Sequence, residues 1–73
     1  KHKEAIKMIE EVISKEEYKN DINLLSNLAY IYIDMNDYNS ALTYLQRLKE
    51  LGRNDEWLNK NLEFVYSKLE NIN

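Results

Sequence analysis

Apolar residues recur with the period of a helix along most of this chain, and two neighbouring runs show it most clearly. The first run consists of Leu24, Leu25, Leu28, Ile31, Tyr32 and Met35, and the second of Tyr38, Ala41, Leu42, Leu45, Leu48 and Leu51. Each run has the i, i+3, i+4, i+7 spacing of one helical face, which predicts helices over residues 22–35 and 38–51. The stretch between them is so short that the two helices must be antiparallel neighbours.

The residues at the turn and on the facing surfaces favour this hairpin. Asn36 tolerates the left-handed conformation that ends many helices. Asp37 can then cap the next helix, because its carboxylate accepts hydrogen bonds from free backbone N–H groups. Ala29 and Ala41 are the small residues on the facing surfaces, where a missing side chain allows close approach of the two backbones.

Weaker patterns on either side predict two further helices. A stripe of Ala5, Ile6, Ile9, Val12 and Ile13 predicts a helix over residues 3–17, and a stripe of Leu58, Leu62, Val65, Tyr66 and Leu69 predicts one over residues 55–70. We expect Asp21 to cap the second helix, and Asn54 or Asp55 to cap the fourth. Gly52 is expected to end the third helix in the left-handed conformation.

The central hairpin also carries the residues of a known repeat pattern, namely Leu25, Leu28-Ala29, Tyr32, Asn36, Tyr38 and Ala41. On these residues it resembles a tetratricopeptide repeat, a helical hairpin that stacks on copies of itself. Two positions depart from the pattern: Leu25 replaces the usual Trp, and Arg53 stands where Pro is usual. The alternative is an unrelated helical hairpin with alanine at its crossing.

Internal similarity extends the resemblance to both ends of the chain. Ala5 and Ile9 match Ala41 and Leu45 at an offset of 36 residues, and Leu62 follows Leu28 by 34, the usual repeat length. We therefore expect one full repeat, at about 22–53, between two half repeats. The resemblance implies an all-α fold, a short right-handed α-solenoid of four helices in a single domain over 1–73. Because Lys1 is not an initiator Met, we expect a fragment of a longer protein.

One position sets the last helix apart from the second. Glu63 follows Ala29 by one repeat length, and burying an unpaired carboxylate costs several kcal/mol. We infer that no helix packs closely against Glu63. Our hypothesis is that this helix is a terminal cap with a solvated outer face, as repeat arrays require.

Composition narrows the classes of partner and chemistry. The formal net charge is −3, and no basic face is visible, which disfavours nucleic acid and with it a helix-turn-helix DNA reader. No apolar stretch approaches the roughly 20 residues of a membrane span, and no signal peptide is visible, so the cytoplasm is the default location. There are no cysteines and only one glycine, which argues against a thiolate metal site and a phosphate-binding loop.

The resemblance implies that an extended peptide or protein segment binds to a groove lined by the first helix of each repeat. The candidate groove residues are Asn23, Ser26, Asn27, Tyr30, Ile33, Asp34, Trp57, Lys60, Asn61 and Phe64, with Lys68 beside them. Tyr30, Trp57 and Phe64 would form an aromatic hot-spot set. The alternative is that these rings pack internally or at a helix boundary. The family's carboxylate clamp for chaperone termini is rejected, since only Asn27 fits it, and a carboxylate needs cationic donors, of which only Lys60 and Lys68 are nearby.

No arrangement of residues points to catalysis. His2, the single histidine, falls in a terminus that we expect to be frayed and solvent-exposed, and no nucleophile–base pair is recognisable. We predict no enzyme activity, no cofactor and no metal. Two functions remain: a peptide- or protein-binding scaffold module, or a structural solenoid segment that self-associates weakly through open helical ends. The identity of a partner is beyond the sequence.

Overall fold

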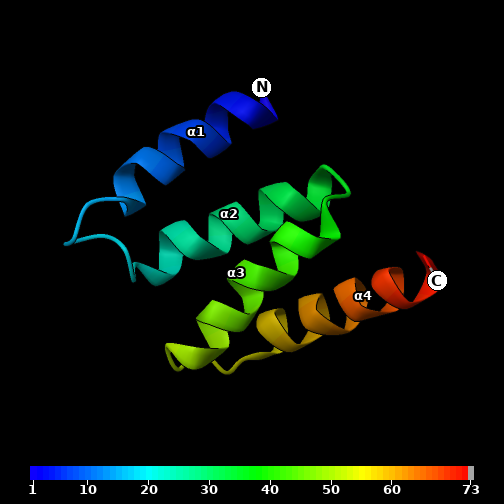
Figure 1. Cartoon of the computed structure of the whole chain (residues 1–73). Helices are drawn as coiled ribbons and strands as arrows, with labels where there is room; N and C mark the ends of the chain where they lie inside the picture. Colours follow the sequence, from blue (N-terminus) through cyan, green and yellow to red (C-terminus); the bar gives the residue numbers. More distant parts are fainter. Residues whose placement is uncertain (73) are drawn as a thin grey trace.

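The computed structural model describes residues 1–72 of the chain, and side chains as far as residue 70. These residues form four helices, α1 (His2–Ile13), α2 (Ile22–Asp34), α3 (Tyr38–Glu50) and α4 (Glu56–Ile72). α1 packs on α2, α2 forms a hairpin with α3, and α4 lies against α3 (Figure 1). The predicted all-α fold of antiparallel helical hairpins is confirmed.

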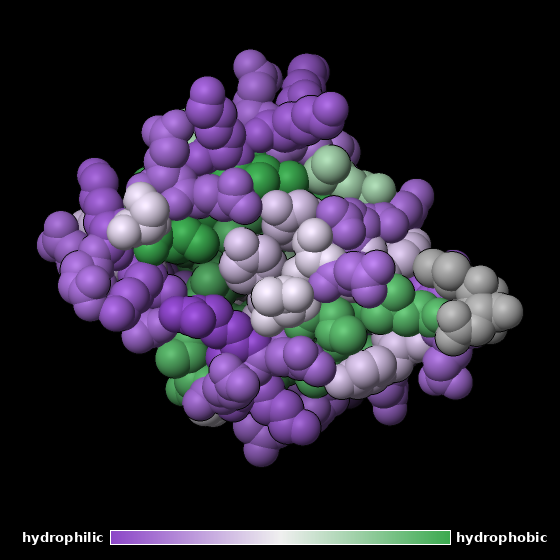
Figure 2. Space-filling model, in the orientation of Figure 1, coloured by the Kyte–Doolittle hydropathy of each residue, from purple (hydrophilic) through white to green (hydrophobic). Residues whose placement is uncertain are grey.

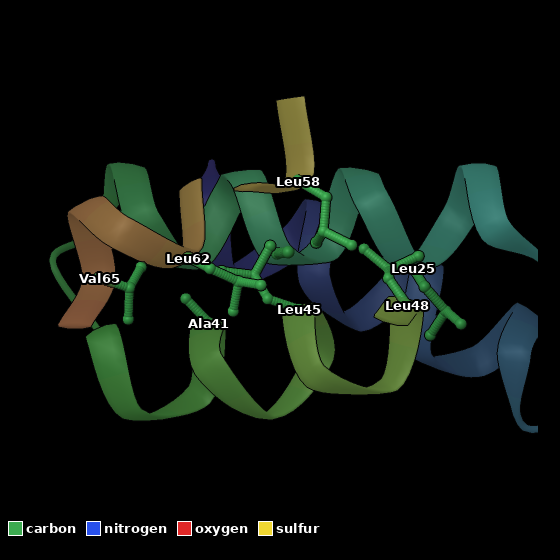
Figure 3. Close-up of a cluster of buried hydrophobic side chains, with 8 residues drawn as sticks. Leu25, Ala41, Leu45, Leu48, Leu58, Leu62 and Val65 are labelled. Carbon is green, nitrogen blue, oxygen red and sulfur yellow. The ribbon is translucent and has the colours of Figure 1, made fainter. Parts of the chain in front are cut away.

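One apolar core joins the central hairpin to α4. Its buried members are Leu25, Ala29, Ala41, Leu45, Leu48, Leu58, Leu62 and Val65, and most of them are labelled in Figure 3. Ala29 and Ala41 both have no exposed surface, as expected of the residues where α2 and α3 cross. α1 adds less to the interior, because Ile6 is its one fully buried residue among those described.

Aspartate side chains cap three of the helices. The Leu24 amide donates to Oδ1 of Asp21 over 3.1 Å, and the Ser40 amide to Oδ1 of Asp37 over 3.3 Å. The Leu58 amide donates to Oδ1 of Asp55 over 2.9 Å, so Asp55 rather than Asn54 caps α4. These bonds satisfy N–H groups that have no partner within their helix.

Two residues with positive φ end the helices of the hairpin. Asn36 has φ of 63° and Gly52 has φ of 104°, which confirms the left-handed conformation predicted for both. The backbone then turns sharply enough for α3 to fold back on α2 and for α4 to fold back on α3 (Figure 1).

The first helix is shorter than predicted. α1 ends at Ile13, whereas the sequence pattern predicted a helix as far as residue 17. The Ser14 hydroxyl donates to the Glu11 carbonyl over 2.7 Å, and residues 14–20 form successive turns. The physical reason is that the apolar stripe stops at Ile13. The residues that follow have no buried contact to offset the entropy of further helix formation.

The outer face of α4 is more polar than the equivalent face of α2. Leu25 and Ala29 are buried in α2, while Asn59 and Glu63, one repeat length later, are exposed. Within the described residues no helix covers Glu63, as expected. Tyr66 was predicted to belong to the core stripe, but 44% of its surface is exposed. That prediction is wrong because no helix among the described residues covers this side of α4.

Candidate functional site

Four of the candidate groove residues form one exposed row along α2. Asn23, Asn27, Tyr30 and Asp34 are all exposed, and their spacing places them on a single helical face opposite the core. Tyr30 leaves 58% of its surface in solvent. We call these four residues the α2 row.

Two other candidates on α2 are turned toward the protein interior. Ser26 is buried, and its hydroxyl donates to the Ile22 carbonyl over 2.7 Å. Ile33 is half-buried and packs against the core cluster. Both were predicted to line the groove, but they lie on the side of α2 that packs against its neighbours. Ser26 and Ile33 therefore help to pack α2 against the rest of the protein and do not offer an exposed surface to a ligand.

The equivalent face of α4 carries Trp57, Asn61, Phe64 and Lys68, one repeat length after the members of the α2 row. We call these four residues the α4 row. Phe64 is 44% exposed, and Lys68 holds its Nζ 5.4 Å from the centre of the Phe64 ring. The Tyr38 ring meets Phe64 edge-on, with 6.0 Å between ring centres. Phe64 therefore has two side-chain neighbours and still leaves a large part of its surface in solvent.

The remaining candidates on α4 are less available. Trp57 is half-buried against the core, and Asn61 donates from Nδ2 to the Trp57 carbonyl over 2.8 Å. Lys60 is exposed and lies 3.6 Å from a Glu56 carboxylate oxygen. Of the three aromatic rings proposed as hot spots, Tyr30 and Phe64 are open to solvent, whereas Trp57 packs at the start of its helix.

Arg53 is the residue that the sequence interpretation missed. Its guanidinium donates to Oδ2 of Asp55 over 3.0 Å and to the Ser26 hydroxyl, and its Cζ lies 4.2 Å from the centre of the Trp57 ring. The Leu58 amide, and after it the Arg53 guanidinium, holds the pKa of Asp55 below its usual value. The one available signal was an arginine in the place where the repeat pattern has proline.

α1 is fastened to the hairpin beside the α2 row. Nε2 of His2 lies 2.6 Å from Oδ2 of Asp34, so the histidine belongs to α1 and has a carboxylate partner, contrary to the frayed terminus predicted. The Tyr32 hydroxyl donates to Glu10 over 3.1 Å, and its ring stacks on Tyr44 at 5.8 Å. Burial, followed by the bond to the Glu10 carboxylate, raises the pKa of Tyr32 to about 12.

Two hollows of the surface lie away from the α2 row and the α4 row. One of about 490 Å³ is lined by Gln46, Lys49, Glu50, Leu62 and Tyr66, between α3 and α4. Another of about 270 Å³ is lined by Lys49, Gly52, Arg53, Asn54, Leu58 and Asn59. No candidate groove residue lines either hollow. In the view of Figure 2, weakly polar and apolar side chains gather over the middle of the face, and hydrophilic side chains surround them.

Neither metal-ligand clusters nor helices long and apolar enough for a membrane are found among the described residues. No group of three or more His, Cys, Asp or Glu side chains stands close enough to hold a metal ion. None of the four helices combines the length and apolar character needed to cross a bilayer.

Stacked antiparallel helix pairs in which equivalent residues recur one repeat length apart are the architecture of a helical-repeat protein. A family model described as "Tetratricopeptide repeat" matches residues 1–59. The chain belongs to the tetratricopeptide repeat family. The comparison with curated proteins gave no match, and neither did the comparison with solved structures. Members of this family are helical scaffolds that generally take part in protein interactions and are typically non-catalytic.

Proposed function

We propose that this chain is a peptide-binding scaffold module that uses the α2 row and the α4 row as its contact surface. The two rows occupy equivalent positions in successive repeat units, so together they offer one extended surface of repeating geometry. Membership of the tetratricopeptide repeat family supports a role in protein interaction. That the two rows are the surface that binds a peptide is our proposal.

The observation that carries the proposal is the exposure of two aromatic rings, Tyr30 at 58% and Phe64 at 44%. They hold the same position in α2 and α4, one repeat length apart. Aromatic side chains supply large contact area for little loss of conformational entropy, and they are enriched among binding hot spots. Neither ring is needed to fill the core, so a role outside the fold accounts for both.

The polar side chains around these rings favour an extended peptide. Asn23, Asn27 and Asn61 each carry an amide that both donates and accepts, which suits the backbone of a bound strand. Asp34 stands in the α2 row and Lys68 in the α4 row, so the two helices present charges of opposite sign. We propose that the module has no catalytic activity, because none of these groups forms a nucleophile–base pair.

The test is peptide capture from a random display library by the wild type and by a double variant, Tyr30→Ala with Phe64→Ala. We expect the double variant to lose capture while its helical circular dichroism stays close to that of the wild type. Tyr66→Ala is the matched control, because Tyr66 is also 44% exposed but lies on the opposite side of α4. Equal loss in the Tyr66 variant, or unfolding of the double variant, contradicts the assignment.

Exposed apolar surface on α1 supports a second candidate function, self-association through an open helical end. Met8 is 68% exposed, and Ala5, Ile9 and Val12 beside it are only half-buried. An exposed apolar edge on a helix of a repeat array favours pairing with another helix. Sedimentation equilibrium over a wide concentration range separates the two candidates. Reversible dimers that Met8→Lys abolishes favour self-association, and a monomer throughout favours the peptide surface.

A further inference from the structure

The connection between α3 and α4 holds an arginine in an unusually constrained setting. The Arg53 side chain is only 21% exposed, although the residue lies in a surface turn. Its guanidinium contacts three groups at once, the Asp55 carboxylate, the Ser26 hydroxyl and the face of Trp57. These three groups belong to α2, to the cap of α4 and to the first turn of α4.

Two of the three partners of Arg53 are also held by another hydrogen bond. The Ser26 hydroxyl donates its hydrogen to the Ile22 carbonyl over 2.7 Å, so its oxygen is free to accept a hydrogen bond from the Arg53 guanidinium. Asp55 uses Oδ1 for the Leu58 amide and Oδ2 for Nε of Arg53. Among the side-chain hydrogen bonds of the described residues, the Arg53–Ser26 bond is the one that links α2 to the chain beyond α3.

We propose that Arg53 is a positioning residue that locks α4 against α2 and thereby fixes the distance and angle between the α2 row and the α4 row. The effect of this positioning on peptide binding rests on the proposed function, in which the two rows are the two halves of the contact surface. The positioning itself does not. Trp57 transmits the position of Arg53 to α4. Its ring is covered by the guanidinium and packs on the core, so it sets the direction in which α4 leaves the turn.

The chemistry favours arginine. A planar guanidinium can stack on an aromatic ring while its edges donate in two fixed directions, whereas a lysine ammonium is a compact point charge with neither a planar face nor a rigid fork of donors. Proline, the usual residue of the repeat pattern here, has no side-chain donor. In this chain a polar junction therefore replaces the rigid turn, and the geometry of the surface depends on side-chain hydrogen bonds.

The chain offers two clean probes of this junction. Trp57 is the single tryptophan, so its fluorescence emission and its quenching by acrylamide report on the contact directly. There are no cysteines, so spin labels attached to Asn23→Cys in α2 and Ser67→Cys in α4 measure one inter-helix distance without background. Both measurements are made on the whole chain without a peptide, in Arg53→Ala, Arg53→Lys and Ser26→Ala backgrounds.

We expect the label-to-label distance distribution to broaden and Trp57 quenching to rise in Arg53→Ala, with helical circular dichroism retained below the melting transition. Arg53→Lys keeps the charge and is expected to rescue neither readout. Ser26→Ala is expected to broaden the distances while leaving the Trp57 emission closer to that of the wild type. Should Arg53→Ala be too unstable to measure, Arg53→Lys carries the test.

Arg47→Ala is the control. Arg47 lies in α3 and donates over 2.6 Å to Asn20, which is in the connection between α1 and α2. Unchanged distances in both Arg53 variants overturn the positioning role, and so does equal broadening in Arg47→Ala. Broadened distances together with unchanged peptide capture by the unlabelled Arg53 variants would instead count against the proposed contact surface. The two proposals therefore fail in distinguishable ways.

Discussion

At the scale of single residues, the two crossing alanines matter most for the fold. Ala29 and Ala41 have no exposed surface, and any larger side chain there must push α2 and α3 apart. We predict that Ala41→Leu destabilises the protein by about 1–3 kcal/mol through overpacking. Urea unfolding measures this, with the exposed Thr43→Leu in the same helix as control. A stable Ala41→Leu variant would show that the crossing is looser than described.

Tyr32 makes the stability of the fold depend on pH. Its pKa is raised from 10.0 to about 12, so the folded state favours the neutral phenol more than the unfolded chain does. The corresponding stabilisation is fully present below pH 10 and is lost as the pH rises through the folded value. We predict that stability falls between about pH 10 and 12. Denaturant unfolding at several pH values tests this, and Tyr32→Phe is expected to flatten the decline.

At the scale of elements, α1 and α4 contribute unequally to the core. α4 supplies Leu58, Leu62 and Val65, whereas the one fully buried residue of α1 is Ile6. We predict that cutting the chain before Asn54 abolishes cooperative melting, because Leu45 and Leu48 then face water. Removal of residues 1–20 is expected to lower the melting temperature but to keep a cooperative transition. Circular dichroism melts that rank the two truncations the other way contradict this assignment.

The elements themselves were largely predictable from local signals. Asp21, Asp37 and Asn36 mark helix ends through bonds to residues only a few positions away, so their roles are visible in the sequence. The junction of Arg53 with Ser26 was not predictable, because it joins residues 27 positions apart and depends on how α4 docks on α2. The candidate surface was likewise predictable only in part. Helical periodicity placed Tyr30 on an open face, but it could not show that Trp57 lies beneath a guanidinium.

At the scale of the whole molecule, the first and the last helix of the described residues differ in the surface that they expose. Apolar side chains, Met8 above all, are exposed on α1, while Asn59 and Glu63 make the outer face of α4 polar. This asymmetry predicts that any self-association uses α1 rather than α4. Glu63→Leu is expected to create a new dimerisation surface at α4, detectable by sedimentation equilibrium. If Glu63→Leu remains as monomeric as the wild type, the polar face of α4 is not what keeps that end apart.

The most direct test of the proposed contact surface is an amide chemical-shift map of the isotope-labelled protein, titrated with a peptide selected by display. We predict that the largest shifts fall on residues of the α2 row and the α4 row, centred on Tyr30 and Phe64, and that Tyr30→Ala removes them. Shifts confined to α1, or to the hollow that Gln46 and Tyr66 line between α3 and α4, would contradict the assignment.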